Sequence, residues 1–351
     1  MPEWLIERGI GETRAALVEN DEIIEARVRR DGVIPAGTIL EARLVAVAPR
    51  VTVEGDGETF LLPRGVSGVS EGRSLLVEVT REALGSAEPW KRGLARITTD
   101  PPRTAPPLAE GREAPIADWD DLLEEARSGL VAFEGGELRI EPTAAMSMID
   151  VDGWLEPPQL AQVAAWTTAR AIRRLDVGGS IGIDFPTLRS REARHDVDRI
   201  LEDYLPKPSE RTAMNGFGFV QIVRPRPRAS LVELAHDRAL FEARALLRRA
   251  CAEPPGPKRV VAHPAVVAVL ENHRPWLDAL GRQLGGSVGL RADAALPMSG
   301  GYAEKACPPQ EMPDLQQAGS ARVRALLQPR LQGPRPAEVA WRRLSDSRAA
   351  G

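Results

Sequence analysis

Two short apolar runs that each end in carboxylates constrain this chain more than any other feature. The first spans residues 148–152 and carries Asp150 and Asp152, and the second ends at Asp184. Between them, apolar residues recur at three- and four-residue spacing over residues 157–175, the period of a helix with one buried face. The pattern predicts a strand–helix–strand unit whose two strands are parallel neighbours.

The acids of this unit are expected to gather at one edge of a sheet. Asp150 and Asp152 are two residues apart on a strand and so point to the same face. Asp184 would lie beside Asp150, because the carboxyl ends of parallel strands meet at one edge. Three carboxylates there repel one another unless a cation neutralises them, and hard oxygen ligands suit Mg²⁺, with Mn²⁺ as an alternative. Each acid taken singly is also compatible with capping a helix or a turn.

Composition places the chain among globular proteins. Its 351 residues are 43% hydrophobic and 27% charged, enough for two or three small domains with a sizeable core. The formal net charge of −4 provides no global basic field. Nearly all positive charge is arginine, which forms bidentate contacts with phosphate, although a GC-rich genome would give the same usage.

Cysteines and apolar runs exclude several classes. Cys251 and Cys307 are far apart, so neither a cysteine-based zinc site nor a disulfide scaffold is expected. The first residues lack a signal-peptide pattern, and no apolar run approaches the roughly 18 residues of a membrane helix. We therefore expect a cytoplasmic protein.

The remaining pattern predicts a mixed α/β (α+β) chain of several subdomains. Short strands expected over residues 39–46, 50–54, 59–62 and 75–80 favour a small barrel of the OB type. Helices are expected over residues 119–128 and about 232–251, and a hairpin with a Gly-Gly turn over residues 131–140. A strand, helix and strand over residues 260–291 predict a small C-terminal βαβ unit. The expected parts are an N-terminal hairpin packed on the core (1–34), an OB-fold insert (35–100), a proline-rich linker (101–117), the mixed α/β core that carries the three acids (118–231), a small α/β subdomain (232–305) and a loosely ordered tail (306–351), with one helix near 320–327.

Three motifs of the chain resemble the ribonuclease E/G family of endoribonucleases. Residues 135–152 (GGELRIEPTAAMSMIDVD) resemble the family's core motif, and residues 169–185 (ARAIRRLDVGGSIGIDF) resemble its second motif, without gaps. Residues 218–231 (GFVQIVRPRPRASL) echo a third. Weaker similarity extends the resemblance to about residues 8–305.

The resemblance implies a metal-dependent site and an RNA path. The family's metal-binding aspartates fall on Asp150 and Asp184, and its supporting Asn falls on Asp152, which completes the expected catalytic set. The barrel would be an RNA-binding insert with Phe60 as its base-stacking residue, although a core strand position explains Phe60 equally well. The other expected RNA-binding residues are basic: Lys91 and Arg92 at the exit of the barrel, Arg170 in the second motif, and the alternating Arg224, Arg226 and Arg228, for which surface charge is the alternative.

Several departures from the family's sequence pattern limit which properties of the family are expected of this chain. The segment that houses the family's pocket for a 5′-monophosphate end is reduced to the linker, so end-sensing is not expected. The cysteine pair of the family's zinc link is missing after Leu231, so neither zinc nor a zinc-linked dimer is expected. Thr187 stands where the family has an acid, and Gly153-Trp154 stand where it has a basic residue.

The sequence therefore predicts a metal-dependent endoribonuclease that cleaves single-stranded RNA to 5′-phosphate and 3′-hydroxyl ends. A catalytically weak or inactive RNA-binding protein of the same family is the alternative, and a DNA nuclease with the same chemistry is a more distant one. No membrane partner is expected, and monomer and homodimer both stay open.

Overall fold

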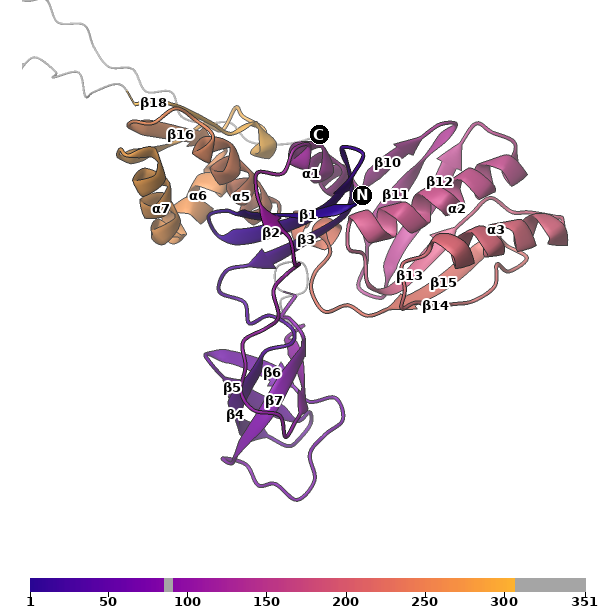
Figure 1. Cartoon of the computed structure of the whole chain (residues 1–351), viewed down its shortest axis with the longest axis horizontal. Coiled ribbons are helices and arrows are strands. Elements are labelled where there is room, and N and C mark those ends of the chain that lie inside the picture. Colours follow the sequence, from indigo (N-terminus) through magenta and orange to yellow (C-terminus); the bar gives the residue numbers. More distant parts are fainter. Residues whose placement is uncertain (85–90, 307–351) are drawn as a thin grey trace, which may run out of the picture. The chain divides into compact units, whose positions relative to one another are not determined.

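The structure is a computed structural model that describes residues 1–84 and 91–306. Within this part of the chain, the strands form a four-stranded sheet, a closed five-stranded barrel, a six-stranded sheet and a three-stranded sheet (Figure 1). The mixed α/β class and the barrel predicted from the sequence are confirmed. The predicted tail and its helix near 320–327 lie outside the described residues. No helix of the described segments has both the length and the apolar character needed to cross a membrane.

The N-terminal sheet has the order β3-β2-β1-β9. The predicted hairpin is present: β2 and β3 pair antiparallel, and Asn20 and Asp21 take positive φ in the turn between them. The sequence did not reveal that β1 covers the other edge of β2, nor that the linker supplies β9, which pairs parallel with β1. The strands are β1 (Glu3–Arg8), β2 (Glu12–Glu19), β3 (Glu22–Arg30) and β9 (Arg112–Glu113).

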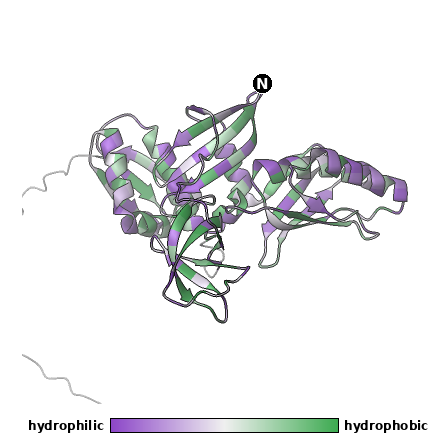
Figure 2. Ribbon diagram, turned by 60° about the horizontal axis from the view of Figure 1, so that its bottom comes forward, coloured by the Kyte–Doolittle hydropathy of each residue, from purple (hydrophilic) through white to green (hydrophobic). Residues whose placement is uncertain are grey.

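The barrel closes in the order β4-β5-β6-β8-β7. Apolar residues that alternate along the strands fill its core, among them Leu44, Val53 and Val77. Figure 2 shows hydrophobic and hydrophilic segments following one another along the strands of the structure. Four strands were predicted within a few residues, and β8 was missed. The strands are β4 (Ile39–Ala46), β5 (Thr52–Gly55), β6 (Glu58–Leu61), β7 (Ser74–Arg81) and β8 (Gly93–Ile97).

The six-stranded sheet has the order β10-β11-β12-β13-β15-β14, and α2 and α3 cover one of its faces (Figure 1). Helix α2 is the predicted crossover, and β12 and β13 are parallel neighbours, as expected. The elements are α1 (Trp119–Ser128), β10 (Leu130–Phe133), β11 (Gly136–Pro142), β12 (Ser147–Gly153), α2 (Pro157–Arg174), β13 (Gly179–Asp184), α3 (Arg191–Tyr204), β14 (Glu210–Arg211) and β15 (Phe219–Arg224).

The C-terminal part contains the two parallel strands of the predicted βαβ unit, but two helices connect them in place of the expected one, and an additional strand pairs with β16. One helix was predicted over residues 232–251, but Asp237 caps a new helix there and divides it into α4 and α5. The elements are α4 (Leu231–Ala235), α5 (Arg238–Cys251), β16 (Lys258–Ala262), α6 (Pro264–Asn272), α7 (Arg274–Leu284), β17 (Val288–Ala292), the 3₁₀ turn η1 (Met298–Gly300) and β18 (Tyr302–Lys305).

A network of charges joins the N-terminal sheet to α5. The half-buried Glu7 carboxylate accepts hydrogen bonds from Arg14 (2.7 Å), Arg248 (3.0 Å) and the backbone N–H of Ile116 (2.9 Å). Burial by itself raises the pKa of Glu7, but these hydrogen bonds and the two arginine charges outweigh it and lower the pKa. Because the pKa is lowered in the folded state, this stabilisation is present above the ordinary pKa of about 4.5 and is lost as pH falls below it.

We expect Glu7→Gln to destabilise the fold by about 2 kcal/mol, because it leaves buried arginine donors without their acceptor. Urea unfolding at neutral pH measures the loss, which should shrink below pH 4 as the wild-type Glu7 carboxylate takes up its proton. Glu3→Gln is the matched control on the same strand, since its pair with Arg112 is exposed to solvent and is expected to contribute little to stability. Equal losses for the two variants would contradict the role of Glu7.

Candidate functional site

Asp150 and Asp184 lie directly opposite each other on neighbouring parallel strands. The register pairs Asp150 of β12 with Asp184 of β13, and Ile149 with Ile183 one position earlier. Both isoleucines are fully buried against the core, while both aspartates are exposed. The strand alternation therefore places the two carboxylates together on the face of the sheet that α2 does not cover. The structure thus brings together the pair that the sequence singled out.

Asp152 extends this acidic group along the same face. It lies two residues after Asp150 and is exposed. Burial raises the pKa of Asp150, and the negative charges of Asp152 and Asp184 raise it further, while Arg139 opposes them. The three acids are therefore close enough to interact, and the charged form of Asp150 is disfavoured without a cation.

The carboxylate oxygens of Asp150 and Asp184 are the type of ligand that a hard divalent cation prefers. Two carboxylates at paired strand positions on an open face match the preference of Mg²⁺ for one or two protein carboxylates completed by water. Among the described residues, no group of three or more acidic, histidine or cysteine side chains is already arranged around a common metal position. Asp150 and Asp184 are the residues that could hold the ion, with water supplying the remaining ligands.

Strand β11 contributes two charged side chains that sequence reasoning did not single out. Arg139 is the cross-strand partner of Asp150, and Glu137 is the partner of Asp152. Their own charged atoms lie 3.6 Å apart. The signal was present in the alternation of the predicted hairpin, which puts both side chains on the strand face that carries the acids. Arg139 supplies a positive charge beside the carboxylates.

Exposed aromatic side chains flank the acids. Trp154 is 81% exposed and follows Asp152 by two residues, and Phe217 is 83% exposed and precedes Phe219, the cross-strand partner of Asp184. A Cβ atom added to Gly182 would lie 2.7 Å from the Phe219 ring, so the absence of a side chain there lets that ring pack on the sheet. The open face thus offers both charge and aromatic surface.

The base-stacking role predicted for Phe60 needs correction. Its side chain is fully buried in the barrel core, and its ring packs on Gly93, where a Cβ atom would approach within 2.6 Å. A ring enclosed in this way has no face free for a base. The alternative of a core strand residue is the one found, because β6 turns Phe60 inward.

The other predicted basic residues occupy different surroundings. Lys91 and Arg92 lie just before β8, and Arg92 is exposed. Arg170 lies on α2, where it pairs with Glu22 and stacks over Trp166 at 4.4 Å from the ring centroid. Because α2 covers the other face of the sheet, Arg170 is not on the face of the acids.

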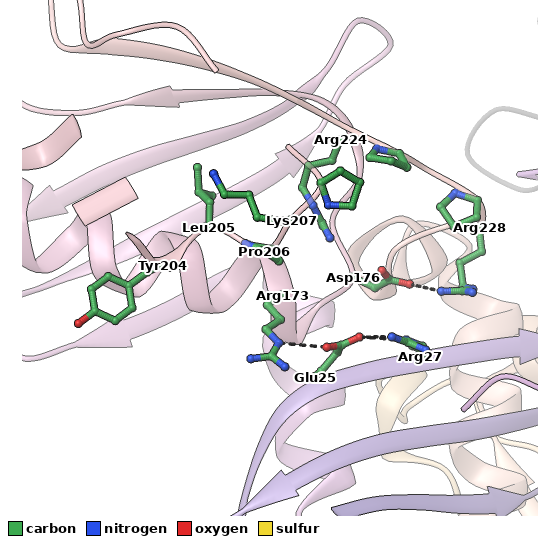
Figure 3. A pocket seen from close by; sticks show the side chains of 13 residues that line it. Glu25, Arg27, Arg173, Asp176, Tyr204, Leu205, Pro206, Lys207, Arg224 and Arg228 are labelled. Atoms are coloured by element: carbon green, nitrogen blue, oxygen red, sulfur yellow. Dashed lines mark hydrogen bonds and ion pairs between the residues drawn. The ribbon is translucent and has the colours of Figure 1, made fainter. Parts of the chain in front are cut away.

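The three alternating arginines do not form one strip. Arg224 and Arg228 line a cavity of about 590 Å³ (Figure 3), where Arg228 pairs with Asp176 at 2.9 Å. Arg226 instead pairs with Glu233 of the α4 capping box. The strand ends at Arg224, so the two-residue alternation that predicted a common edge does not continue through the prolines. The cavity lies on the helix-covered side of the sheet, since Arg224 shares strand parity with the buried Val220 and Ile222.

Known proteins match the central part of the chain. Residues 117–227 match the sequence model of the Ribonuclease E/G family. Ribonuclease G of Escherichia coli (strain K12) is 31% identical over 137 residues, which are 34% of this chain and 28% of that protein. Ribonuclease G of Salmonella typhimurium (strain SL1344) is 31% identical over 133 residues, which are 33% of this chain and 27% of that protein. The match thus spans little more than a quarter of each relative.

The fold defines a mixed α/β core whose open face carries the paired carboxylates Asp150 and Asp184. Residues 117–227, which hold Asp150, Asp152 and Asp184, belong to the ribonuclease E/G family. The matched segment begins before α1 and ends after β15, so it contains every strand of the six-stranded sheet.

Charge repulsion at the acidic edge predicts the response of Asp150→Asn. Because the pKa of Asp150 is raised in the folded state, its ionised form costs stability at pH values above that pKa, and the amide removes this cost. In EDTA, the Tm of the variant should equal or exceed that of the wild type. Saturating Mg²⁺ should raise the wild-type Tm, by an amount equivalent to about 2.7 kcal/mol at 100 times Kd, and leave the variant's unchanged.

Asp278→Asn, an exposed change on α7, is the control for this measurement and should respond to Mg²⁺ as the wild type does. Differential scanning fluorimetry at neutral pH gives all six values. A Mg²⁺ response that is equal in Asp150→Asn and the wild type would rule out Asp150 as a metal ligand.

The burial of Phe60 predicts a loss of stability on truncation. Phe60→Ala should destabilise the barrel by about 3–5 kcal/mol, the usual cost of removing a buried aromatic ring. Val45→Ala, at a position 47% exposed on β4, should change stability by less than about 0.5 kcal/mol. Chemical unfolding followed by circular dichroism measures both. A fully stable Phe60→Ala with weakened RNA binding would restore the stacking role.

Proposed function

We propose that this chain is an endoribonuclease that cleaves single-stranded RNA and requires a divalent cation. The observation that carries the proposal is the in-register pair of exposed carboxylates, Asp150 and Asp184, inside the segment that belongs to the ribonuclease E/G family. The matched relatives bear the name Ribonuclease G. Because the match spans about a third of this chain, the activity of those proteins supports the proposal by analogy with their shared core.

The residues of the open face have different roles in the proposed reaction. Asp150 and Asp184 would hold the cation, and Asp152 would orient a water on the ion or adjust the local charge. A bound Mg²⁺ would polarise the scissile phosphate and lower the pKa of the attacking water. Attack of the water oxygen on phosphorus breaks the bond to the 3′ oxygen, which leaves with a proton, so the products carry 5′-phosphate and 3′-hydroxyl ends. Arg139, opposite Asp150, is placed to counter the phosphate charge.

Single-stranded RNA is the proposed substrate because the acidic edge is flanked by exposed rings. Stacking on aromatic side chains contributes roughly 1–3 kcal/mol per base and tolerates any sequence. Trp154 and Phe217 offer such surfaces next to the acids, whereas the buried Phe60 does not. Arg92 and Lys91 add positive charge near the barrel strand β8.

We further propose that the enzyme is indifferent to the 5′ end of its RNA and needs no zinc. Between the barrel and α1, residues 101–117 contribute only the two-residue strand β9. After Leu231 the chain enters α4 and α5, where the family's paired cysteines would follow. A short linker leaves little room for a separate end-binding subdomain.

A second function, RNA binding without cleavage, has two observations in its favour. No three metal-ligating side chains within the described residues are preassembled around a common position. Thr187, in place of the family's acid, donates its hydroxyl to the Phe217 carbonyl oxygen at 3.3 Å and offers no carboxylate. Against this function stands the acidic cluster itself, because three carboxylates beside RNA phosphates weaken binding unless a cation lies between them.

Cleavage of a fluorescent single-stranded RNA tests the proposal. We expect cutting in Mg²⁺, none in EDTA, and equal rates for substrates with 5′-hydroxyl and 5′-monophosphate ends. Asp150→Asn and Asp184→Asn should each lower kcat by roughly 100-fold or more, because the loss of a metal ligand removes several kcal/mol of transition-state stabilisation.

Asp278→Asn again provides the control, with unchanged cleavage. RNA that binds but stays intact in both Mg²⁺ and Mn²⁺ would favour the binding function. A wild-type rate in Asp150→Asn would refute the assignment of the site, and faster cutting of the 5′-monophosphate substrate would refute indifference to the 5′ end.

A further inference from the structure

The cavity behind the six-stranded sheet is a second site, separate from the acidic edge. It has a volume of about 590 Å³, within the usual range for pockets that bind small molecules. In the β13–β15 register, Arg224 of β15 pairs with Gly179 of β13. Asp184 lies on β13 five residues after Gly179, about 16 Å along the strand from it. Arg224 also points to the opposite face of the sheet from Asp184.

The lining of this cavity is strongly basic. Four arginines and one lysine face two carboxylates, Glu25 and Asp176, which leaves a surplus of three positive charges in the lining. The cationic side chains come from β3, α2, the segment after α3 and the segment at the end of β15, as Figure 3 shows; they are Arg27, Arg173, Lys207, Arg224 and Arg228.

Three of the five cations are held in place by the two carboxylates. Glu25 accepts from Arg27 at 2.5 Å and from Arg173 at 3.0 Å, and Asp176 accepts from Arg228 at 2.9 Å. These pairs position the guanidinium groups and are partly buried. They do not neutralise the lining, because two carboxylates serve three arginines.

Arg224 is the cation whose charge is least compensated. Its Nη1 donates to the Val177 carbonyl oxygen at 2.5 Å, and its Nε is buried without a partner. No carboxylate of the described residues lies within ion-pair distance of it, and burial lowers its pKa. The charges of Asp176 and Glu25 act on Arg224 only from a distance and do not outweigh its burial. A half-buried guanidinium without an ion pair, whose Nε also lacks a partner, is suited to an anionic ligand, and Arg geometry suits phosphate.

The rim of the cavity adds mobile charge and apolar surface. Lys207 pairs with Glu202, which lies outside the lining, but both side chains are more than half exposed, so Lys207 can turn inward at little cost. Tyr204 is 53% exposed at the rim, and Pro206 and Pro225 supply flat apolar walls. Charge at the back and a ring at the mouth match a nucleotide, with its phosphate inward and its base at the rim.

We infer that this cavity binds the phosphate of a nucleotide unit, with Arg224 as its principal ligand and Lys207 closing over it. The phosphate belongs either to an RNA strand, in which case the inference rests on the proposed function, or to a free nucleotide. Both sources present the same oxyanion to Arg224. The acidic edge and this pocket would then contact RNA on two faces of one sheet.

Binding measured in EDTA tests the pocket apart from cleavage. The probes are AMP by isothermal titration calorimetry and a labelled single-stranded RNA by fluorescence anisotropy over a salt series. Arg224→Gln and Lys207→Gln should each weaken the binding of at least one probe about tenfold, close to 1.4 kcal/mol. For RNA, each should also flatten the slope of log K against log salt by about 0.7, the contribution of one phosphate contact.

Arg282→Gln removes the same charge from the exposed end of α7, outside the cavity, and should leave affinity and slope unchanged. Arg224→Gln also loses the hydrogen bond to the Val177 carbonyl oxygen, so circular dichroism and Tm are used to check that this variant is folded. Lys207 is exposed, so Lys207→Gln tests the pocket without a risk of misfolding. If both variants bind AMP more weakly than the wild type, the pocket is a site for a free nucleotide. If the wild type does not bind AMP and both variants bind RNA more weakly, the pocket binds a phosphate of the RNA strand.

Affinity and salt slope equal to the wild type in both variants, for both probes, would overturn the inference. The experiment distinguishes a failure of the pocket from a failure of the proposed activity. Arg224-dependent binding without cleavage would sustain the pocket and refute the endoribonuclease, and cleavage without Arg224-dependent binding would do the reverse.

Discussion

The parallel pairing of β12 with β13 is the constraint on which the rest of the structure depends. It buries Ile149 beside Ile183 and, one position later, exposes Asp150 beside Asp184. A slip by one residue would turn the carboxylates into the core and the isoleucines into water, a change that costs both hydrophobic burial and charge solvation. The same hydrophobic contacts that hold the sheet together therefore also set the geometry of the acidic edge.

The two faces of this sheet carry opposite charge, and each suits a different contact with a phosphate. On the open face, Asp150, Asp152 and Asp184 repel phosphate unless a cation lies between them. On the helix-covered face, Arg224 and its neighbours attract phosphate directly. Strand alternation separates the two groups, so that neither neutralises the other. In the proposed nuclease, RNA binding and bond cleavage would therefore rely on different electrostatics.

Elements with a clear local period were predictable. The helix 119–128 and the strand 39–46 have the predicted bounds, since each buries one regular face of its own residues. Strands that depend on distant partners were missed: β9 exists because the linker pairs with β1, and β8 because the barrel closes. The break between α4 and α5 was also missed, because a single capping side chain there outweighs the continuous helical period.

The acidic edge was predictable from local sequence pattern alone. Two parallel neighbouring strands joined by one helix bring their carboxyl ends to the same edge of the sheet, so the sequence already paired Asp150 with Asp184. Tertiary structure alone decided the rest. Closure of the barrel, which no local period encodes, turned Phe60 inward. The basic cavity joins β3, α2 and the segments after α3 and β15, which are up to two hundred residues apart in sequence. Its charge arises only when packing brings these segments together and leaves Arg224 with no carboxylate partner among the described residues.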